Sequence, residues 1–284
     1  MGGTFVITLR EAFEAALLLG IVYTYLDKVG GRRYYRYVTL GGALGLLASI
    51  GAGVGVSFLS GPLLDLGPDL VAAVVIFAAV ALLTWHGWWM RQHARALKGE
   101  LQQRVEEAQS AGRLWALGTI AFAGVFREGA ETVLFLWGLL AQATSAAGWS
   151  TVAAGVAGVV SAAALGWAIF RGGKQIGLQR FFTVTSVLIL FLAAGLFSAG
   201  IGKLEGLGFL PQPSTLWDSS FLLSDSSVAG SFLGGLVGYR ARPSALEVGA
   251  YVAYTLAASV FLFGDVFRRV RRAPDAASVD RRVA

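Results

Sequence analysis

Long apolar stretches dominate this chain of 284 residues, in which 56% of the residues are hydrophobic and only 14% are charged. A helix needs about 20 apolar residues to cross the roughly 30 Å of hydrocarbon in a bilayer. We therefore predict an all-α integral membrane protein, because helices satisfy their own backbone polar groups in lipid. Seven transmembrane helices are expected, at residues 4–26, 38–60, 69–90, 115–143, 149–170, 181–201 and 245–267.

The placement of basic residues indicates how these helices are oriented. A net charge of +6 would also fit a nucleic-acid-binding protein, but most of the 23 Lys and Arg residues lie in alternate connections and in the tail. Basic residues favour the cytoplasmic side, so we predict the N-terminus outside and the C-terminus inside. Residues 1–267 then form a multi-pass domain in the cytoplasmic (inner) membrane, and residues 268–284 form a basic cytoplasmic tail. No nucleic-acid partner is expected.

Two copies of an R-E-x-x-E pentad lie inside the first and fourth predicted helices. On a helix, the three charged residues of each copy share one face. Each charge at the bilayer centre costs about 2.5–3.5 kcal/mol on insertion scales, so these charges need partners, water or a bound ion. The residues are Arg10, Glu11 and Glu14 in the first copy, and Arg127, Glu128 and Glu131 in the second.

The spacing of the pentads predicts an internal repeat. The copies are 117 residues apart, which sets helices one to three against helices four to six. Three spans leave the chain on the opposite side of the membrane, so the second half is expected to be inverted relative to the first. A seventh helix is added after the two halves. Inverted repeats in transporters place the binding site near the midplane, between the halves.

Four carboxylates in one polar cluster suit a hard, highly charged cation. Arg10 and Arg127 can pair with them when no ion is bound. The chain has no Cys, two His and two Met, so neither an iron–sulfur cluster nor haem is expected. It also lacks a G-x-x-x-x-G-K-[ST] motif, so no nucleotide is expected. We expect a transporter and not an enzyme.

Three other interpretations of the pentads stay open. The Arg and Glu residues could brace buried helices, although buried ion pairs are weak stabilisers. The transported cation could be manganese, lead or protons. An intramembrane carboxylate metalloenzyme is the third alternative, but such sites use Glu-x-x-His motifs, and neither pentad has a His at the matching position.

Acidic residues near the seventh helix are accessory candidates. They lie in or just after the outer connection 202–244, which we expect to fold as a cap or a partly re-entrant segment. Glu247 belongs to an S-x-x-E pattern and is expected to close a capping box. Asp218 and Asp225 lie beside serines and suit turns or N-caps. Together with Glu205 they could instead form an acidic entry for the cation.

Two residues near the inner side are further candidates. His86 lies among tryptophans, for which an interfacial aromatic belt is the simpler account. A role as ligand or proton relay is the alternative. Asp265 is four residues before Arg269, so a helical ion pair is expected, with an exit site as the alternative.

The twin pentads in helices one and four of a seven-helix chain resemble the oxidase-dependent iron permease family, whose bacterial branch serves ferrous-iron uptake systems. The resemblance covers nearly the whole chain, and the first pentad differs only in having Ala12-Phe13 where Gly-Leu is usual. The outer segment also resembles the bacterial branch, at Trp217-Asp218, Leu223-Ser224-Asp225-Ser226-Ser227, Gly238-Tyr239, Pro243 and Glu247.

This resemblance implies the import of iron, delivered as ferric ion after oxidation by a partner protein. Iron is then the transported substrate. The implied iron-handling carboxylates are those of Glu11, Glu14, Glu128 and Glu131, with Arg10 and Arg127 as their companions. Besides the lipid bilayer, the candidate partners are an extracytoplasmic iron oxidase or iron-binding protein and a second copy of the chain.

Overall fold

The fold is a bundle of long helices, as predicted for an all-α membrane protein. The computed structural model describes residues 1–65, 68–93, 97–110, 114–141, 149–172, 178–211 and 214–272. Within these ranges the only strand-like pairing is an isolated bridge between Thr215 and Ser244. Seven long helices coincide with the seven predicted apolar stretches: α1 (Gly2–Lys28), α2 (Tyr35–Asp65), α3 (Pro68–His93), α5 (Leu114–Ala141), α6 (Trp149–Gly172), α7 (Leu178–Gly206) and α9 (Ala245–Arg272).

Most of these helices can cross a membrane by length and composition. Five segments of the described chain are long and apolar enough: Arg32–Val56, which starts in the short 3-10 turn before α2, and Asp69–Met90, Trp149–Ala168, Phe181–Gly206 and Ala245–Leu262. The other two long helices, α1 and α5, each carry the three charges of a pentad. The chain is therefore a multi-pass membrane protein.

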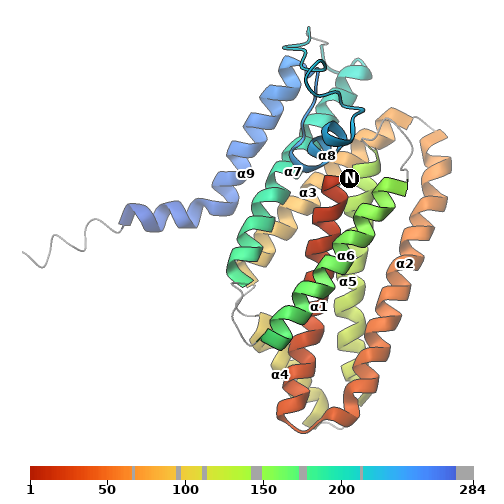
Figure 1. Ribbon diagram of the computed structural model, residues 1–284, viewed down its shortest axis with the longest axis vertical. Helices are drawn as coiled ribbons and strands as arrows, with labels where there is room; N and C mark the ends of the chain where they lie inside the picture. Colours follow the sequence, from red (N-terminus) through yellow and green to blue (C-terminus); the bar gives the residue numbers. More distant parts are fainter. Residues whose placement is uncertain are drawn as a thin grey trace, which may run out of the picture.

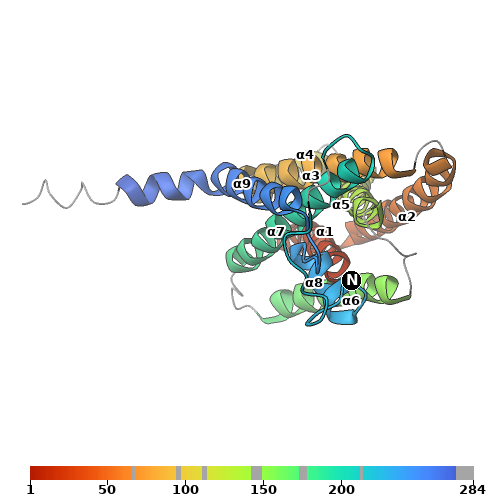
Figure 2. The same cartoon turned by 90° about the horizontal axis from the view of Figure 1, so that it is seen from above.

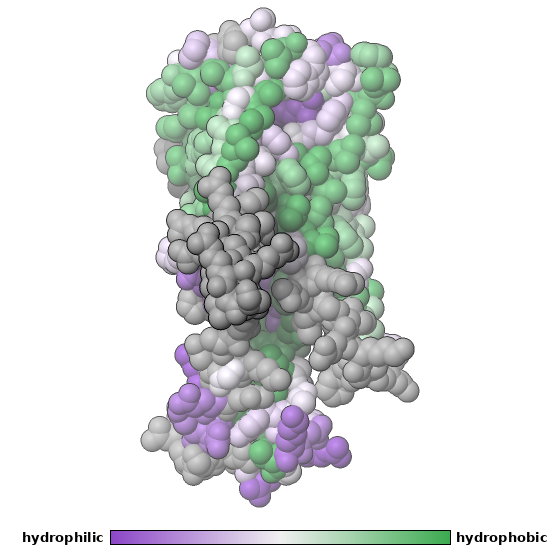
Figure 3. Space-filling model, turned by 90° about the vertical axis from the view of Figure 1, so that its left-hand side faces the viewer, coloured by the Kyte–Doolittle hydropathy of each residue, from purple (hydrophilic) through white to green (hydrophobic). Residues whose placement is uncertain are grey.

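Successive long helices alternate in direction, so that α1 and α5 run antiparallel (Figure 1). Short helix α8 (Val228–Val237) lies at one end of the bundle, and α4 (Leu97–Ser110) lies near the other. We call these the α8 end and the α4 end. Seen from above, α1 lies near the centre, with α2, α6 and α9 toward the periphery (Figure 2). One face of the molecule is largely apolar above and hydrophilic at the α4 end (Figure 3).

Helix α2 packs against α5, and α6 packs against α1. These two pairs have the most extensive contacts. A Cβ on Gly45 of α2 would lie 2.7 Å from the carbonyl oxygen of Phe122, and one on Gly158 of α6 would lie 2.7 Å from that of Phe5. Phe5 and Phe122 are each five residues before the pentad arginine. Small residues allow this close approach of helices in lipid, and here the same crossing occurs twice.

Apolar clusters fill the bundle on both sides of the pentads. Toward the α8 end, the core includes Ile7 of α1, Ile76 of α3 and Leu192 of α7. Toward the α4 end, a second cluster joins α1, α2, α4 and α5, and its fully buried members include Leu26 and Val105. Helix α4 therefore lies on the bundle, with its apolar stripe turned inward.

The predicted outer connection 202–244 is largely folded. The prediction that this connection starts at residue 202 is wrong, because α7 continues to Gly206. Lys203, in this last turn of α7, pairs with Asp69 of α3 at 2.7 Å. Helix α8 begins where the Ser227 hydroxyl accepts a hydrogen bond from the Gly230 amide at 2.9 Å, and Gly238 ends it in the left-handed conformation. Helix α8 packs on the N-terminal part of α1 and on α7. Residues 212–213, and residues 273–284 of the predicted tail, lie outside the described residues.

Candidate functional site

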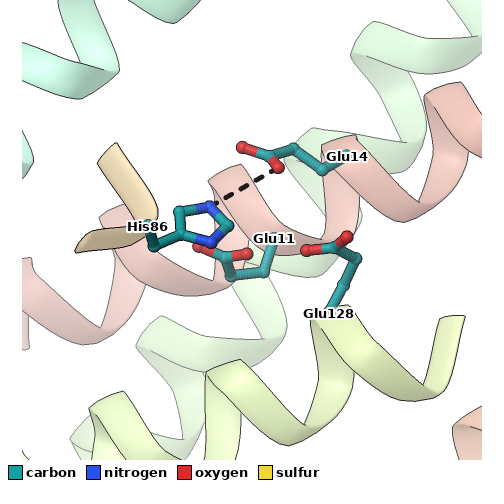
Figure 4. Close-up of side chains that lie close together, drawn as sticks. All are labelled: Glu11, Glu14, His86 and Glu128. Carbon is teal, nitrogen blue, oxygen red and sulfur yellow. Dashed lines mark ion pairs between the residues drawn. The ribbon is translucent and has the colours of Figure 1, made fainter. Parts of the chain in front are cut away.

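Both pentads face a common interior, because α1 and α5 are in contact near the middle of the bundle. The side chains of Arg10, Glu11, Glu14 and Glu128 are buried. Figure 4 shows Glu11 and Glu14 of α1 pointing toward His86 of α3, with Glu128 of α5 close beside them. The two copies of the motif thus meet inside the bundle.

Each arginine pairs with carboxylates of its own helix. The Arg10 Nε donates to Oε1 of Glu14 at 2.9 Å. In the second pentad, Arg127 Nη2 lies 3.0 Å from Oε1 of Glu128, and its Nε lies 3.3 Å from Oε1 of Glu131. The i,i+4 pairing expected from the sequence is therefore present in both copies. The Arg10–Glu14 pair is buried, so removing either partner is expensive, since it leaves an uncompensated charge.

Four residues place one ligand atom each within 4.8 Å of one another: Glu11, Glu14, His86 and Glu128. Both carboxylate oxygens of Glu11, and Oε2 of Glu128, are buried without a hydrogen-bond partner among the described residues. Buried polar atoms are nearly always hydrogen-bonded, so these exceptions call for an explanation. A cation bound between the carboxylates would supply one. The oxygen-rich donor set with one imidazole suits iron among other metals.

His86 lies in the interior of the bundle, between the two pentads. The simpler account assigned it to the aromatic belt, but it is buried, with Nε2 3.7 Å from Oε2 of Glu14 and Nδ1 in contact with Glu131. From its position on α3, His86 therefore connects Glu14 of α1 to Glu131 of α5. Helical spacing carried the signal: Ile76, Leu83 and His86 share the buried face of α3, whereas Trp85 is exposed.

The candidate acidic residues near α9 lie in or beside the cap, by which we mean the folded connection between α7 and α9 at the α8 end. The predicted capping box is present, because the Ser244 amide donates to Glu247 and the Glu247 amide donates to the Ser244 hydroxyl, each at 3.0 Å. The Ser244 hydroxyl also donates to Glu205 at 2.8 Å, and Arg240 pairs with Glu247. Glu205 and Glu247 are therefore held by neighbours within the cap.

The aspartates also hold the cap together. The Ala241 amide donates to Asp225 at 2.8 Å. A hydrogen bond from the Ser220 hydroxyl, another from its amide, and Arg242 lower the pKa of Asp218 to about 2. The Asp218 contacts match the expected turn, whereas Asp225 accepts from a residue sixteen positions away, and the N-cap of α8 is Ser227. Asp265 lies in α9, but its side chain and that of Arg269 lie outside the described residues, so their predicted pairing cannot be compared.

Comparison with known proteins identifies the class of this site. Residues 1–270 match the iron permease FTR1 family. The chain is 33% identical over 259 residues to the ferrous iron permease EfeU of Escherichia coli O157:H7, covering 90% of this chain and 93% of that protein. It is 31% identical over 262 residues to EfeU of Yersinia pestis, covering 91% and 92%. No solved structure matches the chain.

The chain belongs to the iron permease FTR1 family. It is a transporter and not an enzyme, which removes the metalloenzyme alternative, and iron is its transported substrate. The resemblance inferred from the twin pentads is thereby confirmed.

Proposed function

We propose that this protein imports ferric iron across the cytoplasmic membrane and binds the ion between its two pentads. The observation that carries this proposal is the convergence of Glu11, Glu14, His86 and Glu128, with ligand atoms within 4.8 Å of one another. Carboxylate oxygens are hard ligands and suit a highly charged cation. Arg10 and Arg127 limit the repulsion between carboxylates when the ion leaves.

The proposed topology has seven spans, with the N-terminus outside and the C-terminus inside. The antiparallel course of α1 and α5 supports the inverted repeat (Figure 1). So does the repeated glycine crossing, since Gly45 meets Phe122 as Gly158 meets Phe5. The basic turn between α1 and α2 favours a cytoplasmic α4 end. In this orientation the cap faces outward, where an iron oxidase or iron-binding protein could deliver the ion.

Uptake of radiolabelled iron into proteoliposomes tests the proposal. Glu11→Gln keeps the shape of the side chain but removes its charge, so we expect iron uptake to fall at least about tenfold, since even outer-shell changes at metal sites cost that much. Glu107→Gln, an exposed change on α4, is the matched control. Uptake that is equal in both variants would refute the carboxylate site.

The same preparation distinguishes the ion. Ferric and ferrous iron are supplied separately, with manganese and lead as competitors. We expect ferric iron to be taken up and the competitors to have little effect, because three buried carboxylates favour the higher charge. Uptake restricted to ferrous iron would overturn the proposed oxidation state, and full inhibition by manganese would favour the broader cation transporter.

A further inference from the structure

A pocket of about 230 Å³ opens between α3 and α5, beside the carboxylate cluster. Helix α3 contributes His86 and Trp89 to its lining, and α5 contributes Arg127 and Glu131. Toward the α8 end the two helices touch, because a Cβ on Gly138 would meet the side chain of Ala79. The pocket therefore lies on the α4 side of this contact, and it reaches the pentads from the side of the bundle.

The two pentads differ in their access to this pocket. In the first pentad, the side chains of Arg10 and Glu14 are 1% and 4% exposed. In the second, those of Arg127 and Glu131 are 41% and 24% exposed. Glu131 also contacts His86, which in turn lies 3.7 Å from Glu14. Glu131 thus connects the pocket to the buried carboxylates.

Along the bundle axis, the described residues on both sides of the pentads form buried apolar clusters. Toward the α8 end, Ile7 and Phe135 are almost fully buried in the core that also contains Leu192. Toward the α4 end, Val22 and Leu117 have no exposed surface. A hydrated cation cannot enter such packing without losing its water at a large cost. The side pocket instead places three polar or charged side chains, those of His86, Arg127 and Glu131, in a wall otherwise formed by leucine and aromatic residues.

We infer that the pocket between α3 and α5 is the port through which iron reaches or leaves the carboxylate cluster, with Glu131 as the first carboxylate on the route. This inference rests on the proposed function. Arg127 closes the port in this conformation: its guanidinium lies 4.7 Å from the Trp89 ring and pairs with Glu128 and Glu131. Passage requires Arg127 to release Glu131. An arriving cation favours that release, because the cation takes the place of Arg127 as the positive partner of Glu131.

Cysteine accessibility tests the port directly, since the chain has no native cysteine. Leu82→Cys and Leu134→Cys place a thiol on the pocket wall, from α3 and α5 respectively. Val74→Cys and Leu140→Cys are matched controls on the same helices, exposed on the bundle surface but not lining the pocket. A positively charged methanethiosulfonate reagent is added to both sides of proteoliposomes, labelling is followed by mass, and iron uptake is measured before and after.

The pocket cysteines should react at least about tenfold faster than the controls, because only a hydrated thiol ionises to the reactive thiolate. Ferric iron should slow their labelling, and the attached positive group should abolish uptake. Pocket cysteines that react no faster than the controls, or that react without loss of uptake, would overturn the port alone. A parent protein that moves no iron would overturn the proposed function as well.

Discussion

At the scale of single residues, the two pentad arginines are chemically alike but differently placed. Arg10 is enclosed, with 1% of its side chain exposed, whereas 41% of the Arg127 side chain is exposed beside Trp89. A charge that can reach the surface of its pocket can find water, and an enclosed one cannot. The two copies of the motif should therefore respond differently to the same change.

Arg10→Gln should destabilise the protein more than Arg127→Gln. The first change leaves Glu14 buried without its cation, a situation that typically costs about 3–5 kcal/mol. The second also leaves the buried Glu128 without its cation, but it should cost less, because Arg127 and Glu131 are partly exposed and solvent screens part of the loss. Thermal unfolding of the purified protein in detergent measures both, with Arg36→Gln on the exposed start of α2 as control. Equal losses for the two pentad variants would contradict this account.

His86→Gln should lower the apparent affinity for iron at least about tenfold while the protein still folds. The change removes an imidazole ligand atom from the cluster, and a first ligand should matter at least as much as an outer-shell residue. The concentration dependence of iron uptake gives the affinity. Thr84→Ala, a change on the same helix that removes a 2.6 Å hydrogen bond to Tyr254, is the control for general damage to α3. An unchanged affinity in His86→Gln would exclude the residue as a ligand.

The pairing within each pentad could be predicted from the sequence, but the contact of His86 with both pentads could not. Three charges at helical spacing share a face whatever surrounds them, so the pairing of Arg10 with Glu14 follows from the sequence. For His86, the sequence allows two accounts of α3: the face with the neighbouring tryptophans is buried, or the face with Ile76 and Leu83 is buried. Only the packing of α3 against α7 and α5 settles which face is buried.

At the scale of the helix, glycine determines how the halves interlock. Gly45 and Gly158 lie where backbones cross, and a side chain there would meet a carbonyl oxygen at 2.7 Å. The sequence does not show which glycines lie at helix crossings, because Gly51 and Gly55 of the same helix as Gly45 have open space around their Cβ positions. Helix crossing points depend on the tertiary arrangement and not on the local pattern.

Gly45→Ala and Gly158→Ala should destabilise the protein to a similar extent, by about 1–3 kcal/mol each, because the added methyl group forces the helices apart. Gly51→Ala is the matched control and should be neutral or stabilising, since alanine favours a helix by up to about 1 kcal/mol over glycine. Thermal unfolding in detergent measures all three. A large effect at only one of the two crossings would contradict the equivalence of the halves.

At the scale of the whole molecule, the halves meet at a polar centre that apolar clusters close at both ends. The approximate positions of the long helices and the meeting of the pentads could be predicted, because hydropathy and motif spacing depend on the chain alone. The side pocket could not, since it arises from the distance between α3 and α5 on one side of the Ala79–Gly138 contact. The direction of transport then depends on which end of the bundle faces the cytoplasm.

Orientation can be determined with two single cysteines at opposite ends of the bundle. Ser226→Cys places an exposed thiol in the cap, and Lys28→Cys places one at the turn between α1 and α2. Because basic residues favour the cytoplasmic side, an impermeant thiol reagent should label Ser226→Cys in intact cells and Lys28→Cys only after the membrane is opened. Labelling in the reverse order would place the cap inside, and the cap could then no longer receive iron from an extracytoplasmic partner.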